Sequence, residues 1–402
     1  MIEIFSHVWY YFYSAFKGVI FVLFFSKKDK LSRRIDRTFE KLLAEQKIGN
    51  AAVSVIQNGN VLCRSFYGKV KLNGDAVPDE NTMFRLASMT KPVIGVAAMM
   101  QAERGLIDPD APISTYLPSF AEMYIGKEQN GEIIPAQKVK TAVTTRHLLT
   151  HTSGIGSGSF GEVQLITMPQ SAQTALKDAI SYYATLPLLF EPGTRQEYSP
   201  LFGFDILAHL VEVTSGKTID EFLQQELFLP LGMQDTTFDP NEEQKSRLVF
   251  LHDCKDGIVT DVSPVDGAVF GGVPNSRCCG GGGLASTLAD YEKFAQMLLH
   301  EGTYNGVTVL RKETIRQMKT PQVSGKIMPG AQKWGLSMRV ITEKSYAYLP
   351  VGSFGWSGAY GTHFWVDPAN GIAAVLMRNS LIDGGAGART AVRLEKLVYS
   401  SL

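Results

Sequence analysis

The feature that most constrains the fold is a change in the spacing of apolar residues along the chain. Segments 51–57 and 61–67 alternate like strands, and Asn58-Gly59 between them is a dipeptide favoured in tight hairpin turns. Strand-like segments return only near the C-terminus, at 334–341, 351–356, 362–366 and 372–377. Helical spacing dominates the middle. We therefore predict one sheet domain, built from both ends of the chain, that is interrupted by a helical insert.

The expected helices are set by apolar residues three and four positions apart. The strongest covers 88–104, and Gly105 is a credible stop. Its predicted buried face consists of Val93, Val96, Ala97 and Met100. Other helices are expected at 35–43, 145–149, 171–186, 201–214, 219–227, 288–299 and 387–399. The predicted division is an apolar segment at 1–32, a sheet domain formed by 33–113 and 284–402, and a helical domain at 114–283.

Composition excludes several classes of function. Lys plus Arg equals Asp plus Glu at 39 each, and no basic stripe with interleaved aromatics is present, so we do not expect nucleic-acid binding. The four cysteines do not form a disulfide framework or a Cys-x-x-Cys pair, which argues against a zinc knuckle; they are Cys63, Cys254, Cys278 and Cys279. This cysteine usage favours a reduced, cytoplasmic setting.

The apolar run at 8–25 has two interpretations. It is barely long enough to span a bilayer and contains Lys17, while Lys27 and Lys28 begin a basic cluster directly after it. If the run associates with a membrane, the basic cluster places the body of the protein on the cytoplasmic side. The alternative is an amphipathic segment packed on the protein's own surface or on a second subunit of a homo-oligomer.

Ser88 and Lys91 form a Ser-x-x-Lys pattern at the start of the strongest helix. Residues three apart share a helix face, so the ammonium can lie beside the hydroxyl. A helix N-terminus adds positive potential that suits a developing oxyanion, and a neighbouring lysine can help to activate a serine. The pattern is weak when taken alone. An N-cap serine followed by a solvated lysine would give the same letters.

Further motifs in the same order strengthen the assignment. They are Phe84–Pro92, Gly105–Ile113, His147–Ile155, Pro192–Ser199 with the helix that runs to Glu212, and Gly282–Thr287 with Asp290. Together they resemble the beta-lactamase-related serine hydrolases, which include class C beta-lactamases, D-alanyl peptidases and family VIII carboxylesterases. The resemblance covers roughly residue 35 to the C-terminus. It implies an α+β fold of the beta-lactamase/transpeptidase type, an α/β sandwich with a mostly antiparallel sheet plus a helical domain.

Two motifs depart from the pattern of the antibiotic-hydrolysing members. The second reads Tyr198-Ser199-Pro200, where the family usually has Tyr-x-Asn. The third, usually Lys-Thr-Gly, reads Trp356-Ser357-Gly358, so the cation that pairs with a beta-lactam carboxylate is absent. This version is similar to family VIII esterases and related transesterases. We therefore expect a small-molecule ester as the substrate.

The resemblance also implies roles for individual residues. Ser88 would be the nucleophile, and Tyr198 would be the general base together with Lys91, because an adjacent ammonium favours a phenolate. The backbone N–H groups of Ser88 and Ala359 would form the oxyanion hole. Gly358 would allow close backbone approach there, with Trp356 and Ser357 beside it. No metal or organic cofactor is implied.

Alternative functions stay open from the sequence. They are a beta-lactamase or D-alanyl peptidase, an acyltransferase, and a non-catalytic acyl-binding sensor. Gly355-x-Ser357-x-Ala359 nearly matches the nucleophile elbow of α/β hydrolases, but only His363 follows it, so we reject that fold. For His147 and His151, hydrogen bonding at a helix end or in a loop is favoured over a metal site.

Overall fold

The centre of the molecule is a seven-stranded antiparallel sheet with the order β13-β14-β15-β16-β17-β3-β4. Its strands are β3 (Asn50–Gln57), β4 (Asn60–Gly68), β13 (Gln332–Trp334), β14 (Arg339–Ile341), β15 (Phe354–Ser357), β16 (His363–Asp367) and β17 (Ile372–Met377). The computed structural model describes residues 11–12, 21–22, 27–263, 275, 277–323, 332–343 and 348–402. Strand β3 pairs with β17, so both ends of the chain share one sheet, as predicted.

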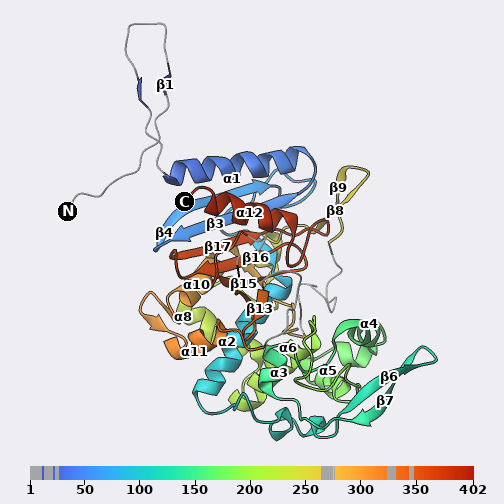
Figure 1. The fold of residues 1–402 in the computed structure, drawn as a ribbon. Helices are drawn as coiled ribbons and strands as arrows, with labels where there is room; N and C mark the ends of the chain where they lie inside the picture. The colour runs from blue at the N-terminus through green and yellow to red at the C-terminus, as the bar shows by residue number, and fades with distance from the viewer. Residues whose placement is uncertain are drawn as a thin grey trace.

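Helices cover both faces of this sheet (Figure 1). Helices α1 (Lys27–Ala44) and α12 (Arg389–Tyr399) lie together on one face, where their apolar residues form a single buried cluster with sheet residues such as Val53 and Trp365. The opposite face packs against α10 (Leu288–Leu299), beyond which lie α2 (Thr90–Glu103) and the larger of the two main apolar cores. This α/β sandwich with an antiparallel sheet is the predicted fold class.

The remaining elements lie outside the main sheet and the four helices named above. The helices are α3 (Thr145–Leu149), α4 (Gly158–Ile166), α5 (Leu176–Tyr183), α6 (Phe202–Ser215), α7 (Ile219–Leu223), α8 (Leu229–Leu231), α9 (Glu242–Ser246) and α11 (Lys312–Met318). Single helical turns are η1 (Ala87–Met89), η2 (Ile113–Thr115), η3 (Pro118–Phe120), η4 (Gln170–Gln173) and the π-turn η5 (Gln224–Phe228). Strand pairs outside the main sheet are β1 (Tyr11–Phe12) with β2 (Phe21–Val22), β5 (Met83–Arg85) with β10 (Ala285–Thr287), β6 (Tyr124–Gln129) with β7 (Glu132–Lys138), β8 (His252–Lys255) with β9 (Ile258–Asp261), and β11 (Thr303–Tyr304) with β12 (Val307–Thr308).

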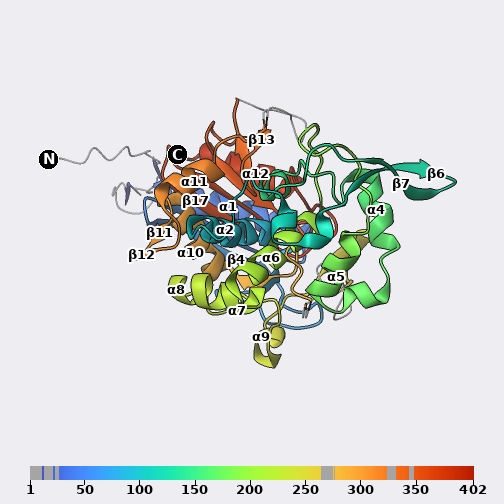
Figure 2. The same cartoon turned by 90° about the horizontal axis from the view of Figure 1, so that it is seen from below.

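Several predicted elements differ from the structure. The helix expected at 88–104 begins as the turn η1. The four residues predicted for its buried face are buried, but so is every other residue from Thr90 to Gln101, and α2 packs against α6. The helix expected at 171–186 is split into η4 and α5, and the strand expected at 334–341 is the hairpin β13–β14. The hairpin β6–β7, which projects beside α4 in Figure 2, was not predicted.

Most of the apolar run at 8–25 lies outside the described residues. The four residues that are described there pair as the short strands β1 and β2. Among the described residues, no helix has the length and apolar character needed to cross a membrane. The interpretations of this run, and the predicted domain boundaries, therefore stay predictions.

Candidate active site

Ser88 lies on η1, the turn that joins β5 to α2. Strand β5 precedes Ser88 and pairs with β10, which follows the four glycines at 280–283. This pairing holds the segment before Ser88 in place. Ala87, directly before the serine, has a φ of 47°, which is uncommon for a residue other than glycine. The backbone N–H of Leu86 bonds to the Leu284 carbonyl at 2.9 Å and helps to hold this conformation. The side chain of Ser88 is thus presented on a firmly held turn.

Lys91 is fully buried and directs its ammonium group at three oxygen atoms. The Nζ atom lies 3.1 Å from Ser88 Oγ, 2.6 Å from the Pro200 carbonyl oxygen and 2.5 Å from the Gly281 carbonyl oxygen. An ammonium has three N–H donors, and here each donor has its own acceptor. A buried charge is tolerated when it is hydrogen-bonded in this way. The predicted pairing of Ser88 with Lys91 is therefore present, and the lysine is a donor to the serine oxygen.

A buried ion pair positions the Gly281 carbonyl. The Gly281 N–H donates to Asp205 Oδ1 at 3.1 Å, and Arg277 Nη2 and the Tyr183 hydroxyl donate to Asp205 Oδ2 at 2.9 and 2.8 Å. A Cβ on Gly281 would lie 2.6 Å from Leu201 Cα, so this peptide fits against the start of α6 only because residue 281 is a glycine. Asp205 and Arg277 are supporting residues that the sequence analysis missed.

Tyr198 lies against the ammonium inside an aromatic cluster. Lys91 Nζ is 5.1 Å from the centre of the Tyr198 ring. The ring centroids of His151, Trp356 and Trp334 lie 4.6, 5.4 and 6.4 Å from that of Tyr198. Trp356 Nε1 donates to the Tyr198 hydroxyl at 3.4 Å. Within the described part of the chain, the phenol makes no direct hydrogen bond to Ser88 or Lys91. The structure brings Tyr198 and Trp356 to the Ser88–Lys91 pair, and it adds Trp334 and His151, which were not predicted as site residues.

His151 is a neutral, buried neighbour of the site. Its Nδ1 atom accepts a hydrogen bond from the Ser199 N–H at 3.1 Å. Burial, and then the nearby Lys91 charge, hold the pKa of His151 well below its usual range. His147 Nδ1 accepts from the Thr144 N–H at 3.2 Å at the start of α3. Each histidine has the local hydrogen-bonding role that its position suggested, and no cluster of potential metal ligands occurs among the residues that the structure describes.

Trp356 and Ser357 of the third motif are neighbours on β15, and their side chains point to opposite faces of the sheet. Trp356 faces Tyr198, whereas the Ser357 side chain points to the face covered by α12. Ser357 Oγ lies 2.8 Å from His363 Nδ1, and His363 Nε2 lies 3.1 Å from Glu395 Oε1. This series looks like a hydrolase triad, but its three side chains are 2%, 1% and 2% exposed. The serine is also on a regular strand rather than an elbow. The structure does not bring the Ser357 side chain to Tyr198.

Gly358 provides the close approach that was predicted for it. A Cβ at this position would lie 2.3 Å from the Leu86 carbonyl oxygen, so the end of β15 touches the backbone just before Ser88. Ala359 follows immediately. The two segments expected to supply oxyanion donors are therefore neighbours in space.

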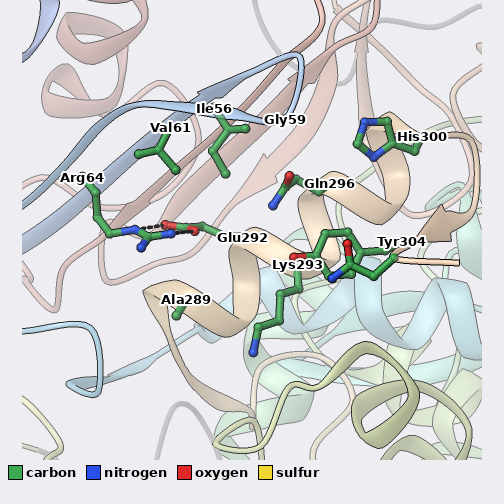
Figure 3. Close-up of a pocket in the computed structure, with 11 residues that line it drawn as sticks. Ile56, Gly59, Val61, Arg64, Ala289, Glu292, Lys293, Gln296, His300 and Tyr304 are labelled. Atoms are coloured by element: carbon green, nitrogen blue, oxygen red, sulfur yellow. Dashed lines mark hydrogen bonds and ion pairs between the residues drawn. The ribbon is translucent and has the colours of Figure 1, made fainter. Parts of the chain in front are cut away.

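A separate pocket of about 540 Å³ lies between the β3–β4 hairpin and α10 (Figure 3). Arg64 Nε bonds to Glu292 Oε1 at 3.0 Å, and Lys293 bonds to Asp290 at 3.0 Å. Its charged groups are thus paired within the protein, and the predicted site residues do not line it.

Comparison with known proteins identifies the family. The family model described as Beta-lactamase matches residues 35–397. The chain belongs to the beta-lactamase family. Protein Rv1367c of Mycobacterium tuberculosis is 30% identical over 344 residues, covering 80% of this chain and 83% of the relative. Esterase EstB of Burkholderia gladioli is 26% identical over 394 residues, covering 92% and 95%. The structure of EstCE1, a hydrolase with promiscuous acyltransferase activity, superposes on this beta-lactamase-family chain with a TM-score of 0.77 at 21% identity. The superposition covers 92% of this chain and 99% of EstCE1, so the two proteins share a fold.

Proposed function

We propose that this beta-lactamase-family protein is a serine hydrolase that cleaves carboxylic esters through an acyl-enzyme on Ser88. The observation that carries the proposal is the 3.1 Å contact between Lys91 Nζ and Ser88 Oγ, with the Tyr198 ring beside the same ammonium. The relationship to Esterase EstB over nearly the full length of both chains supports an ester substrate.

In this mechanism Tyr198 is the general base. The Lys91 ammonium donates to Ser88 Oγ at 3.1 Å, so it stabilises the negative charge that develops on this oxygen as the proton leaves. As the Ser88 oxygen attacks the ester carbonyl, its proton passes to Tyr198. The carbonyl oxygen becomes an oxyanion and accepts hydrogen bonds from the backbone N–H groups of Ser88 and Ala359.

Collapse of the tetrahedral intermediate breaks the bond to the alcohol, which leaves with the proton held by Tyr198. Water then attacks the acyl-enzyme and gives a proton to Tyr198. The bond to Ser88 Oγ breaks, Tyr198 returns the proton to this oxygen, and the carboxylic acid leaves. An alcohol in place of the water would give a new ester, which is acyl transfer. The same groups serve both outcomes, so the identity of the acceptor decides between hydrolysis and transfer.

The third motif favours esters over beta-lactams. Trp356 stands where antibiotic-hydrolysing relatives place a lysine, and its indole packs on Tyr198 and Trp334. The indole carries no charge, so it cannot form an ion pair with a substrate carboxylate. Pro200 stands where the family motif usually has an asparagine, so no side-chain amide is present at this position. The carbonyl oxygen of Pro200 accepts a hydrogen bond from Lys91. Faster turnover of a chromogenic cephalosporin than of esters would contradict this preference.

The decisive experiment compares Ser88, which is hydrogen-bonded to Lys91, with Ser357, which is hydrogen-bonded to a histidine. Ser88→Ala should lower the hydrolysis of p-nitrophenyl butyrate by about a thousandfold or more, and labelling by a fluorophosphonate probe should disappear. Ser357→Ala is the matched variant, because Ser357 is hydrogen-bonded to His363. Labelling should persist in Ser357→Ala, on the peptide that contains Ser88.

If labelling persists in Ser88→Ala and disappears in Ser357→Ala, Ser357 is the nucleophile. Wild-type turnover in Ser88→Ala would refute the proposal. A stable adduct on Ser88 without release of the acyl group would instead indicate an acyl-binding sensor. Product analysis in the presence of added short-chain alcohols separates acyl transfer from hydrolysis.

A further inference from the structure

One side-chain hydrogen bond joins the two segments of the proposed oxyanion hole. Thr362 Oγ1 donates to the carbonyl oxygen of Leu86 at 2.8 Å. Leu86 precedes Ser88 by two residues, and Thr362 follows Ala359 by three. The Thr362 side chain is completely buried, so water does not compete for this bond. The contact links segments that are 276 residues apart.

The turn that contains Ala359 is closed on itself. The Gly358 N–H donates to the Thr362 carbonyl oxygen at 2.8 Å, and the Gly361 N–H donates to the Gly358 carbonyl oxygen at 2.9 Å. Gly385 donates a further bond to the same Gly358 carbonyl at 2.9 Å. Because these bonds span Ala359 on both sides, a displacement of Thr362 would also displace the Ala359 N–H.

The Thr362 hydroxyl also fills the space between the two backbones. A Cβ built on Gly358 would lie 2.1 Å from Thr362 Oγ1 and 2.3 Å from the Leu86 carbonyl oxygen. The glycine, the hydroxyl and the carbonyl are therefore in direct contact. Since the Leu86 N–H is itself bonded to Leu284, the carbonyl is attached to a firmly held segment.

From these contacts we propose that Thr362 is a positioning residue that sets the separation between the Ser88 and Ala359 N–H groups. This inference rests on the proposed function of the same site. An oxyanion hole needs its donors within about 2.7–3.1 Å of the oxyanion, and a productive geometry tolerates shifts of only about 0.5 Å. The contribution is realised mainly in the transition state, so its loss lowers kcat more than it changes KM.

The test is a set of variants that differ in one hydroxyl. Thr362→Val keeps the shape of threonine and removes the donor, while Thr362→Ser keeps the donor and removes a methyl group. With p-nitrophenyl butyrate, kcat should fall on the order of 10- to 100-fold in the valine variant, with KM within a fewfold of wild type. The serine variant should recover most of kcat. The affinity of a boronic acid transition-state analogue should fall in parallel with kcat/KM.

A purely structural role gives a different result. In that case Thr362→Val would lower the melting temperature while the folded enzyme kept its kcat, and this outcome would overturn the inference. Equal losses of kcat in the valine and serine variants would overturn it as well. Thr362→Ala removes the hydroxyl without placing a methyl group against the Leu86 carbonyl, so it replaces the valine variant if that one does not fold. Activity remaining in Ser88→Ala would reject the proposed function itself, whereas an inactive Ser88→Ala with a fully active Thr362→Val would reject only the role of Thr362.

Discussion

Asp205→Asn should destabilise the protein strongly, because it breaks a buried ion pair on one side only. Asp205 is 0% exposed and Arg277 is 4% exposed, and the nearest charged atoms of the two side chains are 2.9 Å apart. Burial within the helices around α6 leaves no solvent to replace the lost carboxylate. Removing one partner from such a pair typically costs about 3–5 kcal/mol, since the remaining charge stays buried and uncompensated.

The size of the effect can be checked against the other bonds to the same carboxylate. The Tyr183 hydroxyl and the Gly281 N–H also donate to Asp205, but an asparagine side-chain oxygen can still accept one of these bonds. Most of the predicted loss therefore comes from the Arg277 charge. The double variant Asp205→Leu with Arg277→Met removes both charges, so it should be less destabilised than the sum of its two single changes by about 2 kcal/mol or more.

Urea unfolding followed by tryptophan fluorescence measures these differences directly. The free energies of unfolding of the wild type, Asp205→Leu, Arg277→Met and the double variant form a complete cycle, and Asp205→Asn is measured beside it. A cost below about 1 kcal/mol for Asp205→Asn, or a double variant that equals the sum of the singles, would show that the pair does not hold this part of the site together.

Three further outcomes follow from other contacts. Gly358→Ala should lower ester kcat at least about tenfold, because its Cβ would lie 2.3 Å from the Leu86 carbonyl oxygen; an unchanged kcat would mean that this approach is not needed. Trp356→Phe removes the N–H that reaches the Tyr198 hydroxyl at 3.4 Å, so ester kcat/KM should fall by about 2- to 10-fold, and an unchanged kcat/KM would mean that this hydrogen bond is not needed. Burial, together with repulsion from Arg378, lowers the pKa of His252 from 6.5 to about 4, so the neutral ring stabilises the fold above pH 6.5. About 3 kcal/mol of that stability should be lost as the pH falls from 6.5 to 4, and a His252→Gln variant should unfold with a flatter pH dependence.

The spacing of apolar residues and the turn dipeptide predicted several helices, strands and one hairpin correctly. Residues 288–299 and 372–377 form a helix and a strand with the predicted ends, and the Asn58-Gly59 turn joins β3 to β4. The hairpin β6–β7 was missed for a physical reason. Both of its strands are largely exposed, so neither face imposes the alternation of apolar and polar residues that identifies a strand.

The supporting contacts of the site could not be predicted from the sequence. Two of the three acceptors of Lys91 are backbone carbonyls, which every residue type carries, and they come from positions 109 and 190 residues away. The Thr362 hydrogen bond likewise ends on a carbonyl. Side-chain motifs identified Ser88 and Lys91, but the backbone atoms that hold them have no signature in the sequence.

These carbonyls change how the Ser-x-x-Lys pattern is interpreted. The same four letters are compatible with a lysine that removes the serine proton and with a lysine that remains charged beside the serine. In this chain the Pro200 and Gly281 carbonyls accept hydrogen bonds from Lys91 Nζ, and the third hydrogen bond of this nitrogen goes to Ser88 Oγ. With Lys91 as the donor to Ser88 Oγ, the mechanism proposed above passes the proton of Ser88 to a different group. Tyr198, whose ring centre lies 5.1 Å from Lys91 Nζ, is the side chain that we propose for this role.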